Sequence, residues 1–218
     1  MCKQHEWLKM NNRIINDPVY GELWEHYVIR IEETIGKALE SHSRTLALRF
    51  DLRLPDIDHE NFGGTDSKAI TRFFQSLKEQ IHADLLRKKK NNKRSHPTSI
   101  RYAWAREFEQ RGIKPHYHIL LLLNKDTYCV PGKYDSELHN LAFMIKEAWC
   151  RALRLGEDYL LRAHPLAHFP KDPFVWLDIN KPDLNESYQI LRHRSLYLAK
   201  VRSKHNEDGF RNFGTSQG

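Results

Sequence analysis

Two histidines separated by one residue, His116 and His118, are the side chains in this sequence best suited to chemistry. They lie early in a stretch, 115–123, whose alternation predicts a β-strand, and residues two apart on a strand point to the same face. Two neutral imidazoles held side by side can bind one divalent metal ion. Two such histidines alone are more often ordinary packing or surface residues, so the hypothesis depends on their surroundings.

A third metal ligand is expected from the neighbouring strand. The preceding stretch also alternates and joins the histidine strand by a short turn, which is typical of an antiparallel hairpin. That turn places Glu107 opposite His116 or Tyr117. Glu109 and Asp51 are alternative ligands, and the non-functional alternative is an exposed Glu107 that pairs with an arginine. Imidazole and carboxylate donors suit Mn²⁺ or Mg²⁺ first and also Zn²⁺.

A tyrosine late in the chain offers a nucleophile. On the last predicted helix, 185–204, Tyr197 lies at the edge of the apolar stripe, and His193, Lys200 and Lys204 flank it at helical spacing. A free phenol has a pKa near 10, and a nearby ammonium group or a metal-polarised phosphate would increase its reactivity. The non-functional alternative is a boundary tyrosine beside surface lysines, which is common on helices.

The elements that must position these residues form a simple pattern. A first helix is expected over 17–39, with Asp17 as its cap and Pro18 in its first turn. A β-α-β-β-α-β series follows, with strands at 45–54, 100–109, 115–123 and 174–179 and helices at 66–90 and 137–154. The pattern predicts an α+β fold with a ferredoxin-like antiparallel sheet, helices on one face, and the other face open for a ligand.

We expect three regions along the chain. These are a helical extension at 1–44, an endonuclease-like domain at 45–204, and a Gly-rich tail at 205–218 that is frayed and flexible.

Composition narrows the class of protein. The chain has 218 residues, 40% hydrophobic, with a net charge of +7, which favours a soluble globular protein with a polyanionic partner such as nucleic acid. Its three cysteines form no CxxC pair, so we expect a reducing cytoplasm and no disulfide framework. A structural zinc site at His164 and His168 is disfavoured by Pro165 between them. No signal peptide or membrane span is expected.

Together these features resemble the HUH endonuclease superfamily, named for a His-hydrophobic-His motif that is here His116-Tyr117-His118. Tyr197-x-x-Lys200 is similar to the single-tyrosine motif of rolling-circle replication initiators. The histidines precede the tyrosine as in that branch, and the stretch around Tyr197 looks most like replication proteins of filamentous phages and related prophage elements. The resemblance covers about residues 45–204, and Glu107 matches the place where some relatives keep a third metal ligand.

The resemblance implies a metal-dependent, site-specific nickase and ligase of single-stranded DNA, hairpins included, at a replication origin. Tyr197 would form a 5′-phosphotyrosine, and Lys200 would stabilise the phenolate or a phosphate oxygen. The chain has no GxxxxGK[ST] loop, so a host helicase would unwind the duplex and a host polymerase would extend the 3′ end.

The resemblance leaves DNA contacts and two rival functions open. Arg49, Asp51 and Arg53 stand on the first strand, where relatives often place a hydroxyl residue. The candidates for DNA contacts share a cationic or hydrogen-bonding side chain, and they are Arg49, Arg53, Arg87, Lys88, Lys89, His193 and Lys204. One rival is a single-tyrosine transposase of the same superfamily. The other is a non-catalytic nucleic-acid-binding module, although that class presents aromatic side chains on its open sheet face.

Overall fold

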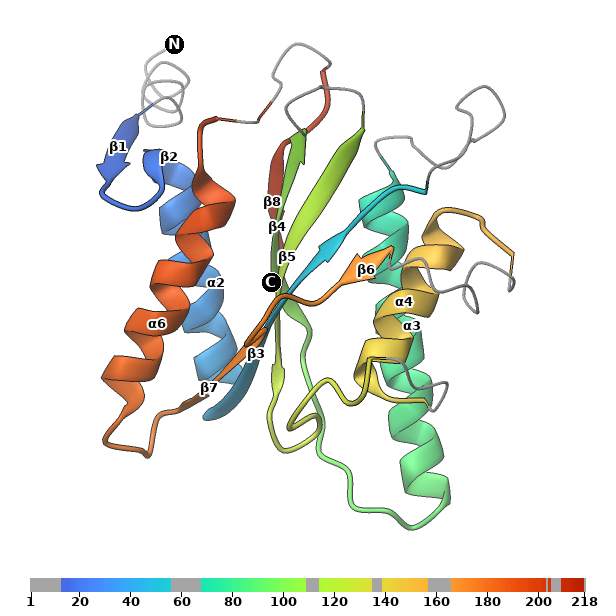
Figure 1. Cartoon of the computed structure of the whole chain (residues 1–218). Coiled ribbons are helices and arrows are strands. Elements are labelled where there is room, and N and C mark those ends of the chain that lie inside the picture. Colours follow the sequence, from blue (N-terminus) through green and yellow to red (C-terminus); the bar gives the residue numbers. More distant parts are fainter. Residues whose placement is uncertain are drawn as a thin grey trace, which may run out of the picture.

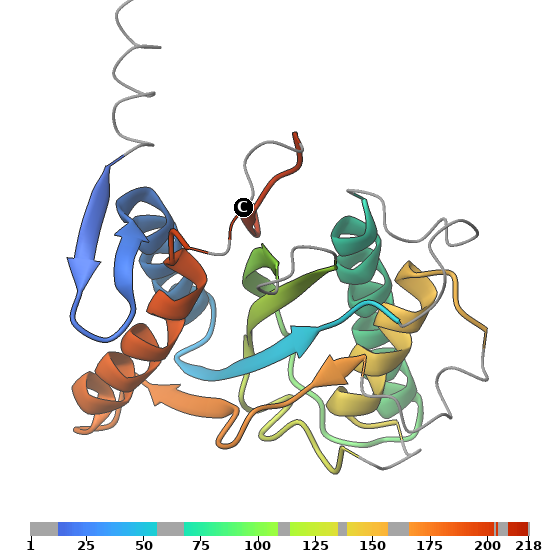
Figure 2. The same cartoon turned by 45° about the horizontal axis from the view of Figure 1, so that its top comes forward.

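The computed structural model describes residues 13–55, 68–108, 114–134, 139–156, 166–202, 204 and 209–217. Its main element is an antiparallel sheet between two layers of helices (Figure 1; Figure 2). The strands are β3 (Arg44–Leu52), β4 (Arg101–Phe108), β5 (Pro115–Asn124), β6 (Ala167–His168), β7 (Phe174–Asp178) and β8 (Phe213–Thr215). Their order is β6-β3-β5-β4-β8. Strand β7 also pairs with β3, along the same edge as β6. The α+β class is confirmed, and the order β7-β3-β5-β4 is that of a ferredoxin-like sheet.

One face of the sheet carries the larger apolar core. Strand alternation sends Leu48 and Phe50 of β3 and Ile119 of β5 to this face, where all three are fully buried. Helices α3 (Ala69–Lys90) and α4 (Leu141–Ala152) cover it with side chains that include Phe73 and Trp149. This layer corresponds to the two helices that the sequence pattern predicts between strands.

The other face is covered as well, so the expectation of an open face is wrong. Helices α2 (Glu25–Ser41) and α6 (Leu184–Leu196) pack on it, as Figure 2 shows. Its central residues are apolar, and the small ones among them, Ala47, Ala103 and Ala105, let the helices approach closely. The apolar stripe of α2 must be buried somewhere, and this face receives it through Ile31 and Ile35.

The described residues before α2, 13–24, contain a β-hairpin and do not begin the expected helix. Strands β1 (Ile14–Asp17) and β2 (Gly21–Trp24) pair antiparallel. The Asp17 carboxylate accepts hydrogen bonds from the backbone N–H groups of Val19 and Tyr20, which makes Asp17 a turn residue where a helix cap was predicted. Gly21 has φ of +74°, a value that favours glycine and closes the turn.

The end of the chain differs from the predicted long helix and frayed tail. Helix α6 ends at Leu196, and a 3₁₀ turn, η2 (Tyr197–Ala199), follows. Lys200 is extended and forms a backbone bridge with Leu23 of β2. Strand β8 pairs with β4, where the composition predicted disorder. No helix among the described residues is both long and apolar enough to cross a membrane.

Candidate metal centre and tyrosine

The β4–β5 hairpin sets Glu107 beside the two histidines. Glu107 pairs with His116 across the hairpin, as the turn position predicted, and Ala105 pairs with His118. All four residues lie on the sheet face covered by α2 and α6, near the end where β5 begins, at the top of Figure 1. Alanine at position 105 leaves lateral space for the imidazole of His118.

The three side chains converge on one point. The Nε2 atoms of His116 and His118 are 3.0 Å apart, and His118 Nε2 is 3.3 Å from Glu107 Oε2. One ligand atom from each residue lies within 4.8 Å of the others. Ligands bind Zn²⁺ at about 2.0–2.2 Å, so two ligands of one ion stand roughly 3 Å apart. The spacing and the donor types therefore fit a single divalent cation.

Asp51, an alternative ligand from the sequence, has a different place. Its Oδ1 lies 2.6 Å from Nδ1 of His118, on the ring nitrogen that does not face Glu107. A carboxylate on one ring nitrogen fixes the tautomer of a histidine and leaves the other nitrogen free to bind a metal. Asp51 therefore orients His118, while Glu109 and His164 lie outside the described residues. His168 Nδ1 is 3.8 Å from Asp51 Oδ2, at the edge of the cluster.

Glu107 is buried at 2% exposure and held as a carboxylate. Burial alone would raise its pKa, but the hydrogen bond with His118 and the charges of Lys204, His118 and Lys200 hold the pKa far below its usual range. Lys200 Nζ is 3.3 Å from Oε2, and Lys204 Nζ is 3.1 Å from Oε1. Burial lowers the pKa of Lys204, and Glu107 opposes this shift. The site therefore presents an anionic ligand to a cation.

Tyr197 lies against this cluster. Its ring packs edge-on to the ring of His118, with centroids 4.7 Å apart. Lys200 Nζ lies 3.4 Å from the centre of the Tyr197 ring, and the guanidinium carbon of Arg49 lies 4.4 Å from it. The side chain of Tyr197 is partly exposed, whereas His118 and Lys200 are each 4% exposed. The phenol of Tyr197 thus lies where the buried side chains of His118 and Lys200 come close to the surface of the molecule.

The N-terminal hairpin positions this tyrosine, a contact that the sequence pattern did not predict. The ring of Tyr20 packs edge-on to Tyr197 with centroids 5.9 Å apart, and it lies 5.1 Å from His193. The backbone N–H of Val201 donates to the carbonyl of Glu22, next to the Leu23–Lys200 bridge. Tyr20 was missed because residues 17–39 were assigned to one helix, which hides the pairing of β2 with the Tyr197 segment.

The cationic residues proposed for DNA contacts separate into two groups. Arg49 and Lys204 contact the site directly, and His193 lies beside Tyr20. Arg53 is exposed, one residue beyond β3 and two residues from Asp51.

The second group stands at the C-terminal end of α3, at the opposite end of the sheet (Figure 1). Arg87 and Lys88 are ion-paired with Asp84 at 2.6 and 2.8 Å, and Lys89 is exposed. The structure therefore does not bring Arg87, Lys88 or Lys89 to the metal centre.

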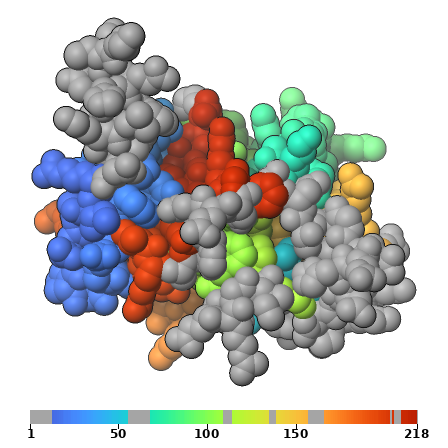
Figure 3. All heavy atoms as spheres, turned by 90° about the horizontal axis from the view of Figure 1, so that it is seen from above, coloured from blue at the N-terminus to red at the C-terminus, as the bar shows by residue number. Residues whose placement is uncertain are grey.

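The end of the molecule that holds the cluster can be viewed from above in Figure 3. Atoms of the β4–β5 hairpin, in lime green, reach the surface there beside the orange-red atoms of the C-terminal third of the chain. A ligand approaching this end would meet chain from both the hairpin and the segment that carries Tyr197.

Comparison with known sequences gives the family. The chain is 39% identical over 201 residues to the uncharacterized protein YagK of Escherichia coli (strain K12), covering 88% of this chain and 94% of that protein. It is 34% identical over 210 residues to the uncharacterized protein YfjJ of the same strain, covering 93% of this chain and 99% of that protein. No solved structure matches the chain. Residues 4–216 match the family described as the YagK/YfjJ C-terminal domain, and the chain therefore belongs to that family.

Proposed function

We propose that this protein is a metal-dependent endonuclease of HUH type that nicks and rejoins single-stranded DNA through Tyr197, as an initiator of rolling-circle replication. The observation that carries the proposal is the meeting of two elements far apart in the sequence. The donor set of buried Glu107 and His118 and partly buried His116 lies in contact with Tyr197 through the ring of His118. A metal centre alone would fit many functions, and the adjacent phenol favours covalent phosphoryl transfer.

The residues of the chain divide the reaction between them. The phenol of Tyr197 loses its proton, and its oxygen bonds to the phosphorus of the scissile phosphate. The bond from that phosphorus to the 3′ oxygen of the preceding nucleotide breaks, and the 3′ oxygen takes up a proton. The products are a 5′-phosphotyrosine and a free 3′-OH. A phosphodiester is exchanged for a phosphodiester, so the 3′-OH can reverse the reaction and rejoin the strand.

Glu107, His116 and His118 would hold the metal ion, with Asp51 orienting His118. A bound divalent ion supplies Lewis-acid polarisation of the phosphate and charge neutralisation. Mn²⁺ or Mg²⁺ is the first expectation for this donor set, with Zn²⁺ as the alternative.

Lys200 is placed to assist Tyr197. Its ammonium group lies above the phenol ring and 3.3 Å from Glu107. A positive charge at that position can offset negative charge that develops on the attacking oxygen or on a phosphate oxygen during the reaction, and Arg49 adds a second positive charge on the same ring. Lys200 and Glu107 are buried on the inner side of the site, where water screens charges less than at the surface.

The test is the capture of the covalent intermediate. The protein is incubated with end-labelled single-stranded DNA and Mn²⁺, denatured, and separated by gel electrophoresis. We expect a labelled band that survives denaturant, disappears with EDTA, and is absent in the His116→Ala/His118→Ala variant.

Each of the other outcomes points elsewhere. Cleavage by that double variant in chelator would refute the metal role. Absence of an adduct with Mn²⁺, Mg²⁺ and Zn²⁺ would favour the non-catalytic nucleic-acid-binding module. If an adduct forms, replication of a circular plasmid, compared with excision of a donor element, separates a replication initiator from a transposase.

A further inference from the structure

A small cavity lies next to Tyr197, between α6 and the strands β3 and β7. Its volume is about 200 Å³, and its walls include the apolar side chains of Ala47, Leu120, Leu191 and Leu198. Drug-sized ligands need roughly 300–1,000 Å³, while a single water needs only about 10–15 Å³. The cavity is therefore suited to one planar ring system. We call it the α6 pocket.

The α6 pocket shares a side chain with the tyrosine site. Arg49 lines the pocket, and its guanidinium lies over the ring of Tyr197. On the sheet, Arg49 pairs with Leu120, which also lines the pocket, and Asp51 pairs with His118. Residues two apart on a strand are separated by about 7 Å. A group in the pocket is thus one such step away from the metal centre, the distance between neighbouring parts of one ligand.

The polar groups of the pocket are mainly hydrogen-bond donors. Arg49 and Arg194 both line it, and Nε of Arg49 is buried without a hydrogen-bond partner among the described residues. Lys171 and Asp172 lie at its rim and are exposed, and the backbone oxygen of Asp172 accepts a bond from Arg194. Guanidinium groups donate and cannot accept. The pocket therefore favours a ring whose edge carries acceptors.

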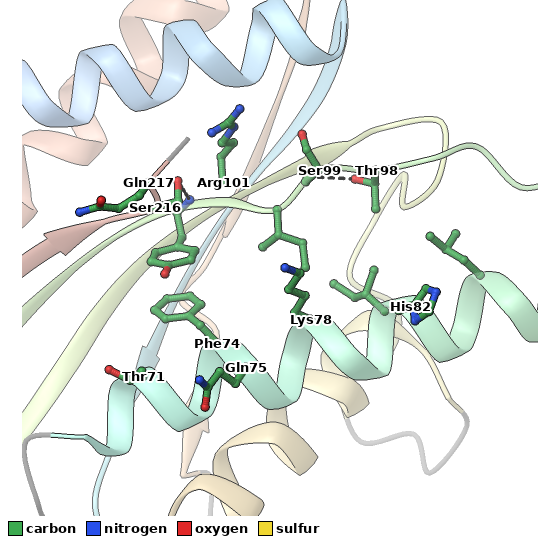
Figure 4. A pocket seen from close by; sticks show the side chains of 14 residues that line it. Thr71, Phe74, Gln75, Lys78, His82, Thr98, Ser99, Arg101, Ser216 and Gln217 are labelled. Carbon is green, nitrogen blue, oxygen red and sulfur yellow. Dashed lines mark hydrogen bonds between the residues drawn. The ribbon is translucent and has the colours of Figure 1, made fainter.

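A larger cavity elsewhere lacks this relation to Tyr197. It has a volume of about 730 Å³ and lies between α3 and the beginning of β4 (Figure 4). Phe74 and Tyr102 stack on each other there with centroids 3.5 Å apart, so two ring faces are already used. Arg101, on its lining, is six residues from Glu107 on the same strand, which is roughly 20 Å. Of these two cavities, the α6 pocket is the one connected to the proposed nucleophile, through Arg49.

We propose that the α6 pocket binds one nucleobase of the single-stranded DNA, beside the scissile phosphate, and that it prefers guanine. This inference rests on the proposed function, because it takes the phosphate to lie at Tyr197. Guanine presents N7 and O6 as two acceptors on one edge, which arginine donors match, whereas adenine presents a donor beside its N7. Proteins bind a nucleotide with apolar walls against its flat base and with cationic groups beside its phosphate. The pocket gives the nicking site a means of selecting its sequence.

The test measures binding and does not require cleavage. The parent protein carries Tyr197→Phe, and the probes are fluorescein-labelled dC 12-mers with a central dG, dA, dT or abasic position. Fluorescence anisotropy should show tighter binding of the dG probe than of the dA or abasic probe, on the order of tenfold. Val175→Phe, which fills the pocket from β7, and Arg194→Gln should each reduce this preference to less than about twofold. Arg192→Gln is the control, because Arg192 is also on α6 but pairs with Glu32 outside the pocket.

Equal binding of the four probes by the parent protein, or a guanine preference that survives Val175→Phe, would overturn the proposal. If Val175→Phe does not fold, as judged by its thermal melt, Arg194→Gln alone decides. The two proposals fail separately. If an adduct forms but no base is preferred, the pocket proposal fails and the nicking proposal stands. If a base is preferred but no adduct forms, the nicking proposal fails and base binding in the pocket stands.

Discussion

Two clusters in this molecule contain the same three kinds of side chain, and only one is a candidate for catalysis. In the first, buried Asp84 is paired with Lys88 at 2.8 Å, and Lys88 Nζ lies 4.5 Å from the centre of the Tyr128 ring. In the second, Glu107, Lys200 and Tyr197 repeat this arrangement, with Lys200 3.4 Å from the ring centre. A buried carboxylate, a lysine and a tyrosine ring therefore do not make a site by themselves.

The clusters differ in how the tyrosine is used and in what lies beside the carboxylate. The hydroxyl of Tyr128 donates to Asp84 at 2.8 Å. Burial and this bond raise the pKa of Tyr128 far above its usual range, so its hydroxyl stays protonated. Tyr197 instead contacts His118, and two imidazoles lie beside the Glu107 carboxylate. The comparison teaches that the histidines turn a structural ion pair into a candidate metal centre.

The sharpest way to break this comparison is to remove each tyrosine hydroxyl. Tyr197→Phe should lower adduct formation at least about 10³-fold, because a nucleophile has no substitute. It should change the free energy of unfolding little, since one oxygen is lost at a partly exposed position. Tyr128→Phe should leave the adduct intact and reduce stability by about 1–2 kcal/mol, because Asp84 loses a buried hydrogen bond. Gel assays and urea unfolding measure both, and the reverse pattern would exchange the roles of the clusters.

Removal of each carboxylate charge should separate the clusters by their response to metal. Mn²⁺ at about 100 times its Kd should raise the free energy of unfolding of the wild type by about 2.7 kcal/mol. Glu107→Gln should abolish most of this increase, and Asp84→Asn should retain it, although both variants lose a buried charge. Thermal melts with Mn²⁺ and with EDTA give the readout. An equal Mn²⁺ effect in the two variants would place the ion elsewhere.

The histidine double variant also tests the comparison, and the structure changes the effect on folding that we expect from it. An open sheet face would make His116→Ala/His118→Ala neutral for folding, but His118 is buried and bonded to Asp51. We now expect a loss of roughly 1–3 kcal/mol, because Asp51 and Glu107 lose a buried partner. His116→Ala alone, at a less buried position, should be milder while still weakening metal binding. Urea unfolding in EDTA checks both values.

The two lysines should differ less than the tyrosines. Lys200→Ala should reduce the rate of adduct formation by about 10- to 100-fold, because it removes charge stabilisation and keeps the nucleophile. Lys88→Ala should leave that rate unchanged. Single-turnover kinetics with Mn²⁺ in excess compare the two. A rate for Lys200→Ala equal to the wild type would limit Lys200 to holding Glu107.

The smallest expected effect is a pH dependence of the structural cluster. Burial would raise the pKa of Asp84, but hydrogen bonds from Lys88, Tyr128 and Arg87 outweigh it and lower the pKa. A depressed folded pKa contributes stability that is complete above the unfolded value of about 3.9 and is lost as the pH falls through the folded value. The stability difference between wild type and Asp84→Asn should therefore shrink below about pH 4. A difference that is constant from pH 7 to pH 3 would contradict this.

The sequence predicted those parts of the site that depend on local periodicity. Alternation and turn length place Glu107 opposite His116 because hairpin pairing is a local property. Contacts between distant segments were not predictable in this way. Asp51 reaches His118 across β3 and β5, and Tyr20 reaches Tyr197 through a hairpin whose turn residues, Asp17 and Pro18, also suit a helix start. The covered second face also depends on where α2 and α6 pack, which periodicity does not specify.

The central claim is that Tyr197 is the nucleophile of a metal-dependent nicking reaction. Its most direct test is mass spectrometry of tryptic peptides from the denatured protein–DNA adduct formed with Mn²⁺. The account predicts a nucleotide 5′ phosphate attached to the hydroxyl of Tyr197 and to no other residue, with no adduct in EDTA. Attachment at Tyr20, Tyr188 or a serine, or an adduct that forms equally well in EDTA, would contradict it.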